Sequence, residues 1–191
     1  HLGAGLEQFR GHRGLTYVAV TSADRGHLNE LARLDQLVTL ELIKPASGET
    51  GLDSLSRMPN LREILVRDCD CLAGIFRQVS ALDQIETLDI DNGSGFKDDD
   101  LESLPNLKNL RHLRVTNCPR IGDLGLERIS RLDSLETLVL TGSVGTVTEN
   151  GVRSLSRMQK LAGLTLLARE FSPAQIDELS RELPACKLDA R

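Results

Sequence analysis

A six-residue pattern, apolar-x-x-apolar-x-apolar, restarts seven times along this chain. The seven starts are Leu15, Leu37, Leu61, Ile85, Leu110, Leu135 and Leu161. Successive starts lie 22, 24, 24, 25, 25 and 26 residues apart. A nearly fixed period of this length indicates one supersecondary unit that stacks on copies of itself. We therefore expect one elongated repeat domain over residues 1–191, with about seven repeats.

Each six-residue segment alternates apolar and polar positions, as a half-buried strand does. Apolar residues at helical spacing follow every segment. The first, second, fifth and sixth of these sets are Leu28, Leu31 and Leu34; Leu52, Leu55 and Met58; Leu126, Ile129 and Leu132; and Val152, Leu155 and Met158. Parallel strands joined through helices coil right-handedly. The sequence thus predicts an α/β solenoid, with a curved parallel sheet inside and short helices outside.

Local signals refine the expected helices and the two ends. Asp123, Thr148 and Ser172 are expected to cap helix N-termini. Pro105 lies inside a helix expected at 99–107, which should therefore be short or irregular. Residues 1–14 are expected to form part of a preceding repeat, with either an open first layer or more protein before it. At the other end, Pro184 should stop a helix before one last short strand, so that 172–191 form a C-terminal cap.

Two stretches resemble a known family. Residues 110–126, which include Cys118 and the run Ile-Gly-Asp-Leu-Gly-Leu, resemble the cysteine-containing leucine-rich repeats, and Cys69 occupies the same ninth repeat position. Residues 171–188, with their Leu-Pro-Ala-Cys-Lys-Leu ending, are similar to the terminal cap of bacterial proteins of this type. The resemblance implies the leucine-rich-repeat fold, a bacterial source and protein binding as a class. No F-box-like segment is visible, so a ubiquitin-ligase role is not implied.

Composition limits the classes of partner that the protein is expected to bind. The net charge is −5, which does not fit a general nucleic-acid footprint. No apolar run approaches the roughly 20 residues that span a bilayer. Reduced cysteines fit a cytoplasmic protein, although a removed signal peptide stays open because the chain begins at His1. We expect a protein partner, no nucleic acid and no membrane, and a monomer or part of a larger chain.

Strand positions three, five and seven are expected to point out of the concave sheet face. The candidate partner-binding residues on this face are Glu41, Glu63, Arg67, Asp89, Asp91, His112, Arg114, Thr141 and Leu167. The first half of the face is acidic, His112 and Arg114 are basic, and the end is neutral and partly apolar. This gradient is interpreted as a partner's footprint with Arg114 as its anchor, since Arg is enriched at binding hot spots. The alternative is that exposed strand positions are simply polar.

A second candidate surface lies on the helices. Arg33, Arg57, Arg131 and Arg157 each sit four residues before the next repeat start. Such a column suits docking to an acidic partner or to another domain. The alternative is a solvated edge whose arginines pair with Glu and Asp.

Candidate metal sites are weak. Cys69, Cys71, Cys118 and Cys186 are even in number, but Cys69-Asp-Cys71 lacks the two-residue gap usual for zinc. The ninth-position cysteines are better explained as small buried residues at a tight bend. The acidic loop at 89–100 has Ser94 where a calcium loop needs Gly, which favours a turn over residues 92–95. No metal or cofactor is expected.

Candidate catalytic residues are equally few. No motif places a nucleophile, and the one enzymatic alternative pairs His112 with Asp89 as acid and base. A shallow, wet surface shifts pKa values poorly. The sequence therefore predicts a non-catalytic module that binds a protein on its concave sheet face. The alternative is a scaffolding or regulatory segment of a larger protein that docks through its helical face or its open N-terminal layer.

Overall fold

The computed structural model describes residues 14–45, 51–69, 75–142 and 147–191. Within these residues, eight strands form one open parallel sheet in sequence order, β1 to β8. The strands are β1 (Tyr17–Thr21), β2 (Thr39–Ile43), β3 (Glu63–Arg67), β4 (Thr87–Asp91), β5 (His112–Thr116), β6 (Thr137–Thr141), β7 (Gly163–Leu166) and β8 (Lys187–Ala190). The predicted α/β solenoid is confirmed, and β8 is the predicted last short strand. The partial repeat expected at 1–14 lies almost wholly outside the described residues.

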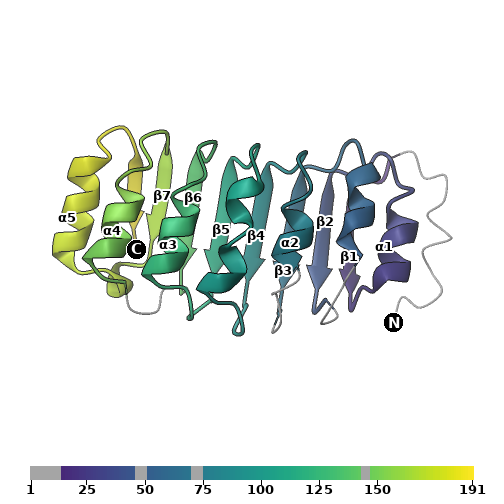
Figure 1. Cartoon of the computed structure of the whole chain (residues 1–191), viewed down its shortest axis with the longest axis horizontal. Coiled ribbons are helices and arrows are strands. Elements are labelled where there is room, and N and C mark those ends of the chain that lie inside the picture. Colours follow the sequence, from purple (N-terminus) through teal and green to yellow (C-terminus); the bar gives the residue numbers. More distant parts are fainter. Residues whose placement is uncertain (1–13, 46–50, 70–74, 143–146) are drawn as a thin grey trace.

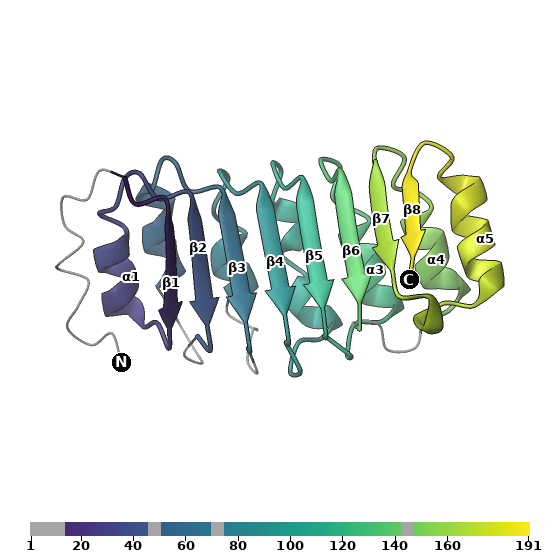
Figure 2. The same ribbon diagram turned by 180° about the vertical axis from the view of Figure 1, so that it is seen from behind.

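Helices cover one side of the sheet and leave the other side open. Figure 1 shows them in front of the strands, and Figure 2 shows the uncovered strands from behind. The α-helices are α1 (Arg25–Leu31), α2 (Ile75–Val79), α3 (Asp123–Ile129), α4 (Glu149–Leu155) and α5 (Pro173–Glu182). The 3₁₀ helices are η2 (Leu52–Arg57), η3 (Asp98–Leu101), η4 (Leu104–Asn106) and η5 (Ala168–Glu170). Residues 99–107 thus form two short pieces instead of one helix, as Pro105 predicted.

The strands pair so that equal repeat positions face each other. Leu88 of β4, for example, lies between Ile64 of β3 and Leu113 of β5. The strand leucines, isoleucines and valines of the pattern are buried, and they form one continuous core with the apolar faces of the helices. Successive residues of a strand point to opposite faces, so positions three, five and seven are left on the open side.

A left-handed residue follows each of the first six strands. The non-glycine residues are Ser22, Lys44, Asp68, Asn92 and Asn117, with φ from 47 to 58°, and the sixth is Gly142 at 62°. All occupy the eighth repeat position, and the sequence motifs did not predict a left-handed conformation there. The left-handed conformation turns the chain away from the strand, and the first five amides donate to the last residue of the next strand. Asn117, for instance, donates its amide to the carbonyl of Thr141 at 2.9 Å.

Aspartates link the helix starts of neighbouring repeats. The Asp98 carboxylate accepts the amide of Gly122 at 2.8 Å, and the Asp123 carboxylate accepts the amide of Thr148 at 2.8 Å. The prediction that Asp123 caps its own helix is therefore wrong. Gly122 holds the N-cap position of α3 without a side-chain bond, since Asp123 reaches across to the next repeat. Thr148 and Ser172 do cap α4 and α5, as expected.

Glycines make room for these aspartates. An added Cβ on Gly125 would lie 2.5 Å from Asp98 Oδ1, and one on Gly151 would lie 2.5 Å from Asp123 Oδ1. Each glycine is buried and is the third residue of its helix. Any side chain at this position would displace the neighbouring aspartate carboxylate from the backbone amide to which it is hydrogen-bonded. The Asp-x-Gly-Leu motif thus combines residues that serve two interfaces: the Asp contacts the following repeat, and the Gly accommodates the preceding one.

The ninth-position cysteines are buried, as expected. Cys69 and Cys118 expose 2% and 0% of their surfaces. The Cys118 thiol lies 3.2 Å from the carbonyl of Thr116. Burial raises the pKa of this thiol from its usual 9.0 to about 11. Cys71 lies outside the described residues.

We expect Gly125→Ala and Gly151→Ala each to lower the free energy of unfolding by roughly 1–2 kcal/mol, because the new methyl group pushes an aspartate off its amide. This loss would outweigh the higher helix propensity of Ala. Gly163→Ala in β7 is the matched control, since its Cβ would meet nothing nearer than 3.5 Å. Urea unfolding followed by circular dichroism measures all three. Equal stability of the three variants would contradict the role given to the glycines.

We expect alkaline pH to destabilise the protein partly through Cys118. A thiol whose folded pKa is raised keeps its full contribution below pH 9, and that contribution is lost as the pH rises from 9 through about 11. Cys118→Ala should therefore lose less stability than the wild type over this range, by up to about 2 kcal/mol. Urea unfolding at pH 9 and at about pH 11 under reducing conditions tests this prediction. Cys186→Ala, which replaces a half-buried cysteine, is the control. An unchanged pH dependence in Cys118→Ala would contradict the assignment.

Candidate partner-binding face

The open side of the sheet carries every candidate binding residue. We call the side chains at strand positions three, five and seven the sheet face. Strand alternation directs them away from the buried leucines and the helices, to the side of the sheet that Figure 2 shows. Most of these side chains are half-buried between their neighbours, whereas Tyr17, Thr21, His112 and Arg114 are exposed. Thr116 is the exception, since only 4% of it is exposed. Leu167 lies just beyond the end of β7 and is half-buried.

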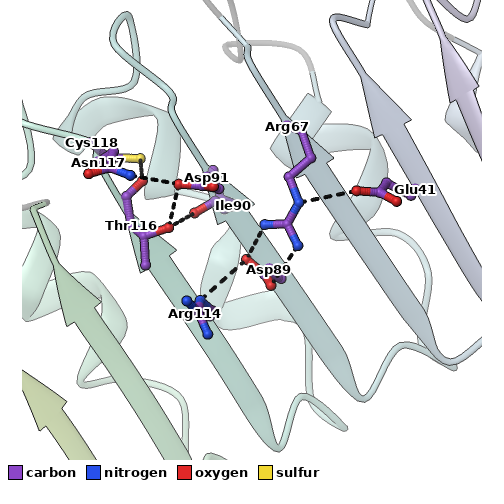
Figure 3. Close-up of polar contacts among 9 residues, drawn as sticks. All are labelled: Glu41, Arg67, Asp89, Ile90, Asp91, Arg114, Thr116, Asn117 and Cys118. Carbon is purple, nitrogen blue, oxygen red and sulfur yellow. Dashed lines mark hydrogen bonds and ion pairs between the residues drawn. The ribbon is translucent and has the colours of Figure 1, made fainter.

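Arg67 joins two acidic candidates across three strands. Its Nη1 and Nη2 lie 2.8 and 3.0 Å from the two carboxylate oxygens of Asp89 on β4. Its Nε lies 3.3 Å from Glu41 Oε1 on β2. Figure 3 shows the guanidinium between the two carboxylates. Such two-pronged geometry is the strongest form of an Arg–carboxylate pair.

The contacts of Arg67 extend to both sides. On β1 the hydroxyl of Tyr17 donates to Glu41 Oε2, and this bond raises the pKa of Tyr17. On β5 the Nε of Arg114 lies 3.9 Å from Asp89 Oδ1. We call Tyr17, Glu41, Arg67, Asp89 and Arg114 the sheet-face network; it crosses five neighbouring strands. Its two acidic and two basic groups balance, but Glu63 and Asp91 add further negative charge, so Arg67 and Arg114 neutralise the predicted acidic half of the face only in part.

Asp91 lies beside this network and has its own partners. Its Oδ1 accepts the hydroxyl of Thr116 at 2.7 Å and the side-chain amide of Asn117 at 2.9 Å, as Figure 3 shows. Partial burial works to raise the pKa of Asp91, but these two hydrogen bonds, helped by the charges of Arg67 and Arg114, lower it overall. The Asp91 carboxylate is therefore held in its charged form, and the Thr116 side chain beside it is buried.

The remaining candidates lie apart from the network. Glu63 accepts the hydroxyl of Thr39 at 2.9 Å, and His112 Nδ1 lies 2.7 Å from the hydroxyl of Thr137. Thr141 ends β6 beyond Arg114. The register sets Asp89 opposite Arg114 and sets His112 opposite Thr87. The acid–base pair considered between His112 and Asp89 is thus not formed.

The acidic residues of η3 are satisfied by protein donors. Asp98 accepts the amide of Gly122, and Asp100 accepts the amide of Lys97 at 3.0 Å. Asp99 lies 3.5 Å from Arg128. Among the described residues, no group of three or more His, Cys, Asp or Glu side chains is placed to hold a metal ion. In the same part of the chain, every helix is too short or too polar to cross a membrane.

The arginines of the helical side differ from one another. Arg33 and Arg131 pair with acids of their own helices, Glu30 at 3.2 Å and Glu127 at 2.7 Å. Arg57 and Arg157 are exposed, and neither lies within 4 Å of an acidic group of the described residues. Arg157 lines a shallow groove between α3 and α4 together with Arg153 and Leu124. The pairing expected of a solvated edge is therefore found at two of the four positions.

The sequence pattern did not predict the contacts of three residues that lie on or beside the sheet face. Tyr17 was placed on the face but not among the binding candidates, and neither Thr116 nor Asn117 was connected with Asp91. One signal was available for Asn117: it occupies the eighth position, where Asn, Asp and Gly recur, as expected of a left-handed turn.

Comparison with known proteins adds little beyond the fold. No protein-family model matches the sequence, and a search of curated proteins finds no match. Among solved structures, a leucine-rich-repeat protein of Leptospira interrogans is 12% identical with a TM-score of 0.45, over 96% of this chain and 56% of that one. A plant peptide hormone receptor, RGFR1 in complex with RGF2, is 14% identical with a TM-score of 0.44, over 84% of this chain and 29% of that one.

A probable mandelate racemase from Alicyclobacillus acidocaldarius also matches, at 15% identity and a TM-score of 0.32, over 94% of this chain and 51% of that one. The chain thus spans less than two thirds of each of these proteins. TM-scores below 0.5 carry no functional argument. The parallel strand order, the register and the one-sided helices of this chain themselves identify its fold as a leucine-rich-repeat solenoid.

Proposed function

We propose that this chain is a non-catalytic protein-interaction module that binds a partner on the sheet face. One observation carries the proposal: a whole face of an eight-stranded parallel sheet is uncovered. Parallel sheets are normally covered on both faces, and solenoids that leave one face open use it for binding. With strands about 4.8 Å apart and five residues long, the face measures roughly 34 by 17 Å. This projected area of roughly 580 Å² is about three quarters of the ~800 Å² that one partner contributes to an ordinary interface, and the relief of the side chains adds to it.

The sheet-face network supports binding by holding side chains in place before a partner arrives. Arg67 exposes 26% of its side chain and Asp89 exposes 16%. Side chains that are already ordered lose little conformational entropy when a partner binds. The same pairing occupies the charged groups that acid–base catalysis would need, which fits a binding role. A protein partner suits the mixed charges of the face better than a nucleic acid, which needs a strongly basic surface.

The groove between α3 and α4 supports a second candidate function. Leu124 is 43% exposed there, beside Arg153 of α4 and Arg157 just after that helix. Asp123 and Glu127 also line the groove, but Thr148 and Arg131 engage their carboxylates. An apolar side chain next to two cations suits docking of an acidic segment, as a scaffolding or regulatory part of a larger protein requires. We propose this role as the alternative function. For either function, we propose that the protein is cytoplasmic and is a monomer or part of a longer chain.

The two functions predict different effects of surface variants. Thr137→Arg with Thr165→Arg places two bulky cations on the sheet face, and Arg153→Ser with Arg157→Ser alters only the helical side. Affinity capture from the native host, read out by mass spectrometry, should lose the specific partner with the first pair and keep it with the second. Circular dichroism checks that both variants fold. Loss with the second pair alone would contradict sheet-face binding and support the alternative.

The network should also stabilise the fold. We expect Arg67→Met to lower the free energy of unfolding by roughly 1–3 kcal/mol, because it leaves the half-buried Glu41 with only the Tyr17 hydroxyl and the half-buried Asp89 with only its longer contact to Arg114. Arg111→Met is the matched control, since Arg111 makes a 3.1 Å pair with Glu136 in a more exposed setting. Its loss should stay below about 1 kcal/mol. Urea unfolding measures both, and equal losses would contradict the special role of Arg67.

A further inference from the structure

Arg114 is the basic group of the sheet-face network that has the weakest partner. Its Nε lies 3.9 Å from Asp89, and 56% of its side chain is exposed. Asp89 is already engaged through both oxygens by Arg67 at 2.8 and 3.0 Å. Among the described residues, no acceptor lies within hydrogen-bonding distance of the Arg114 guanidinium. The donor fork of Arg114 is therefore available to a ligand.

The two strands directly beyond Arg114, β6 and β7, carry no charge on the sheet face that would compete for this fork. The next charges are Lys187 and Asp189 of β8, and Asp189 is paired with Arg191 at 2.8 Å. The register places Val139 of β6 beside Arg114 and Thr165 of β7 beyond it. The neighbouring positions on these two strands are Thr137, Thr141 and Gly163. Val139 and Thr165 are half-buried and present a flat, partly apolar shelf. A cation thus borders a neutral surface, and His112 lies two residues away on the same face of the strand.

The surroundings of Arg114 select the ligand's chemistry. A carboxylate carries one negative charge and matches a guanidinium with two parallel hydrogen bonds. A phosphate carries nearly two charges and would be repelled by Asp89 at 3.9 Å from the Arg114 Nε. Nucleic acid is disfavoured for the same reason. Charge complementarity therefore favours an Asp or Glu side chain of a protein over a phosphorylated residue.

We propose that Arg114 binds the side-chain carboxylate of an extended segment of the protein partner, and that an apolar residue of that segment packs on Val139 and Thr165. This inference rests on the proposed function and names the partner's chemistry. Two strand spacings, from β5 to β7, measure roughly 10 Å, and an extended chain covers about 3.3 Å per residue. The apolar residue should therefore lie within about three positions of the acidic one.

A displayed library of random peptides of about 12 residues, selected on the 191-residue chain, supplies the probe. We expect the enriched peptides to share an Asp or Glu with an apolar residue within about three positions. For a synthetic peptide of this set, Arg114→Gln should weaken binding by roughly tenfold or more, as measured by fluorescence anisotropy. Replacing the peptide's Glu by Gln should have a similar effect, and the two changes together should add little to either.

Arg181→Gln on α5 is the matched control, since it removes the same charge from an exposed residue that belongs neither to the sheet face nor to the groove between α3 and α4. Its affinity should equal that of the wild type. Peptides that tolerate Arg114→Gln but are lost with Thr137→Arg and Thr165→Arg would overturn the inference and leave sheet-face binding standing. Peptides lost only with Arg153→Ser and Arg157→Ser would overturn both.

Three further results would also overturn the inference. One is tighter, Arg114-dependent binding after the peptide's acidic residue is replaced by phosphoserine, which would mean that the site prefers a phosphate. The second is enrichment of peptides without acidic residues. The third is a selection that enriches no peptide, which would contradict recognition of a short extended segment.

Discussion

Parallel, in-register pairing of neighbouring strands is the constraint on which the rest of this molecule depends. Each strand places its residues beside the residues of equal repeat position, so the leucines form continuous buried rows. The polar side chains of the opposite face form continuous rows for the same reason. Residues that are more than 20 positions apart in the sequence, such as Arg67 and Asp89, therefore become immediate neighbours. A repeat buries its own apolar side only by stacking on the next one.

The fold could be predicted because the periodic leucines encode both the strand and its direction of burial. The helix interruption at Pro105 and the N-caps at Thr148 and Ser172 could also be predicted, since their effects are local. Asp123 was misread because its partner belongs to the following repeat. The role of Gly125 was hidden for the same reason, because the aspartate that needs the space comes from the preceding repeat. Contacts between repeats depend on distances that a one-dimensional pattern does not contain.

The candidate site could be predicted as a set of positions, but not as a set of pairs. The register places Arg67 directly opposite Asp91, yet Arg67 reaches diagonally to Asp89 and Glu41 at the fifth position. Asp91 instead accepts Thr116 and Asn117 of the following repeat. Side-chain length and competing donors decide between the direct and the diagonal partner. As a result, the acidic charge that the sequence predicts for the face is partly neutralised by Arg67 and Arg114, and Arg114 is the more exposed of these two cations.

The sheet-face network also constrains how this chain can change its length during evolution. Repeat proteins commonly gain or lose whole units, and one unit here covers residues 61–84. Deleting that unit would keep every leucine row intact, so the core would close as before. It would, however, set β2 beside β4 and bring the carboxylates of Glu41 and Asp89 together without the arginine that separates them. The repeats are therefore interchangeable in their packing but not in their charge, and their order is part of the design of the face.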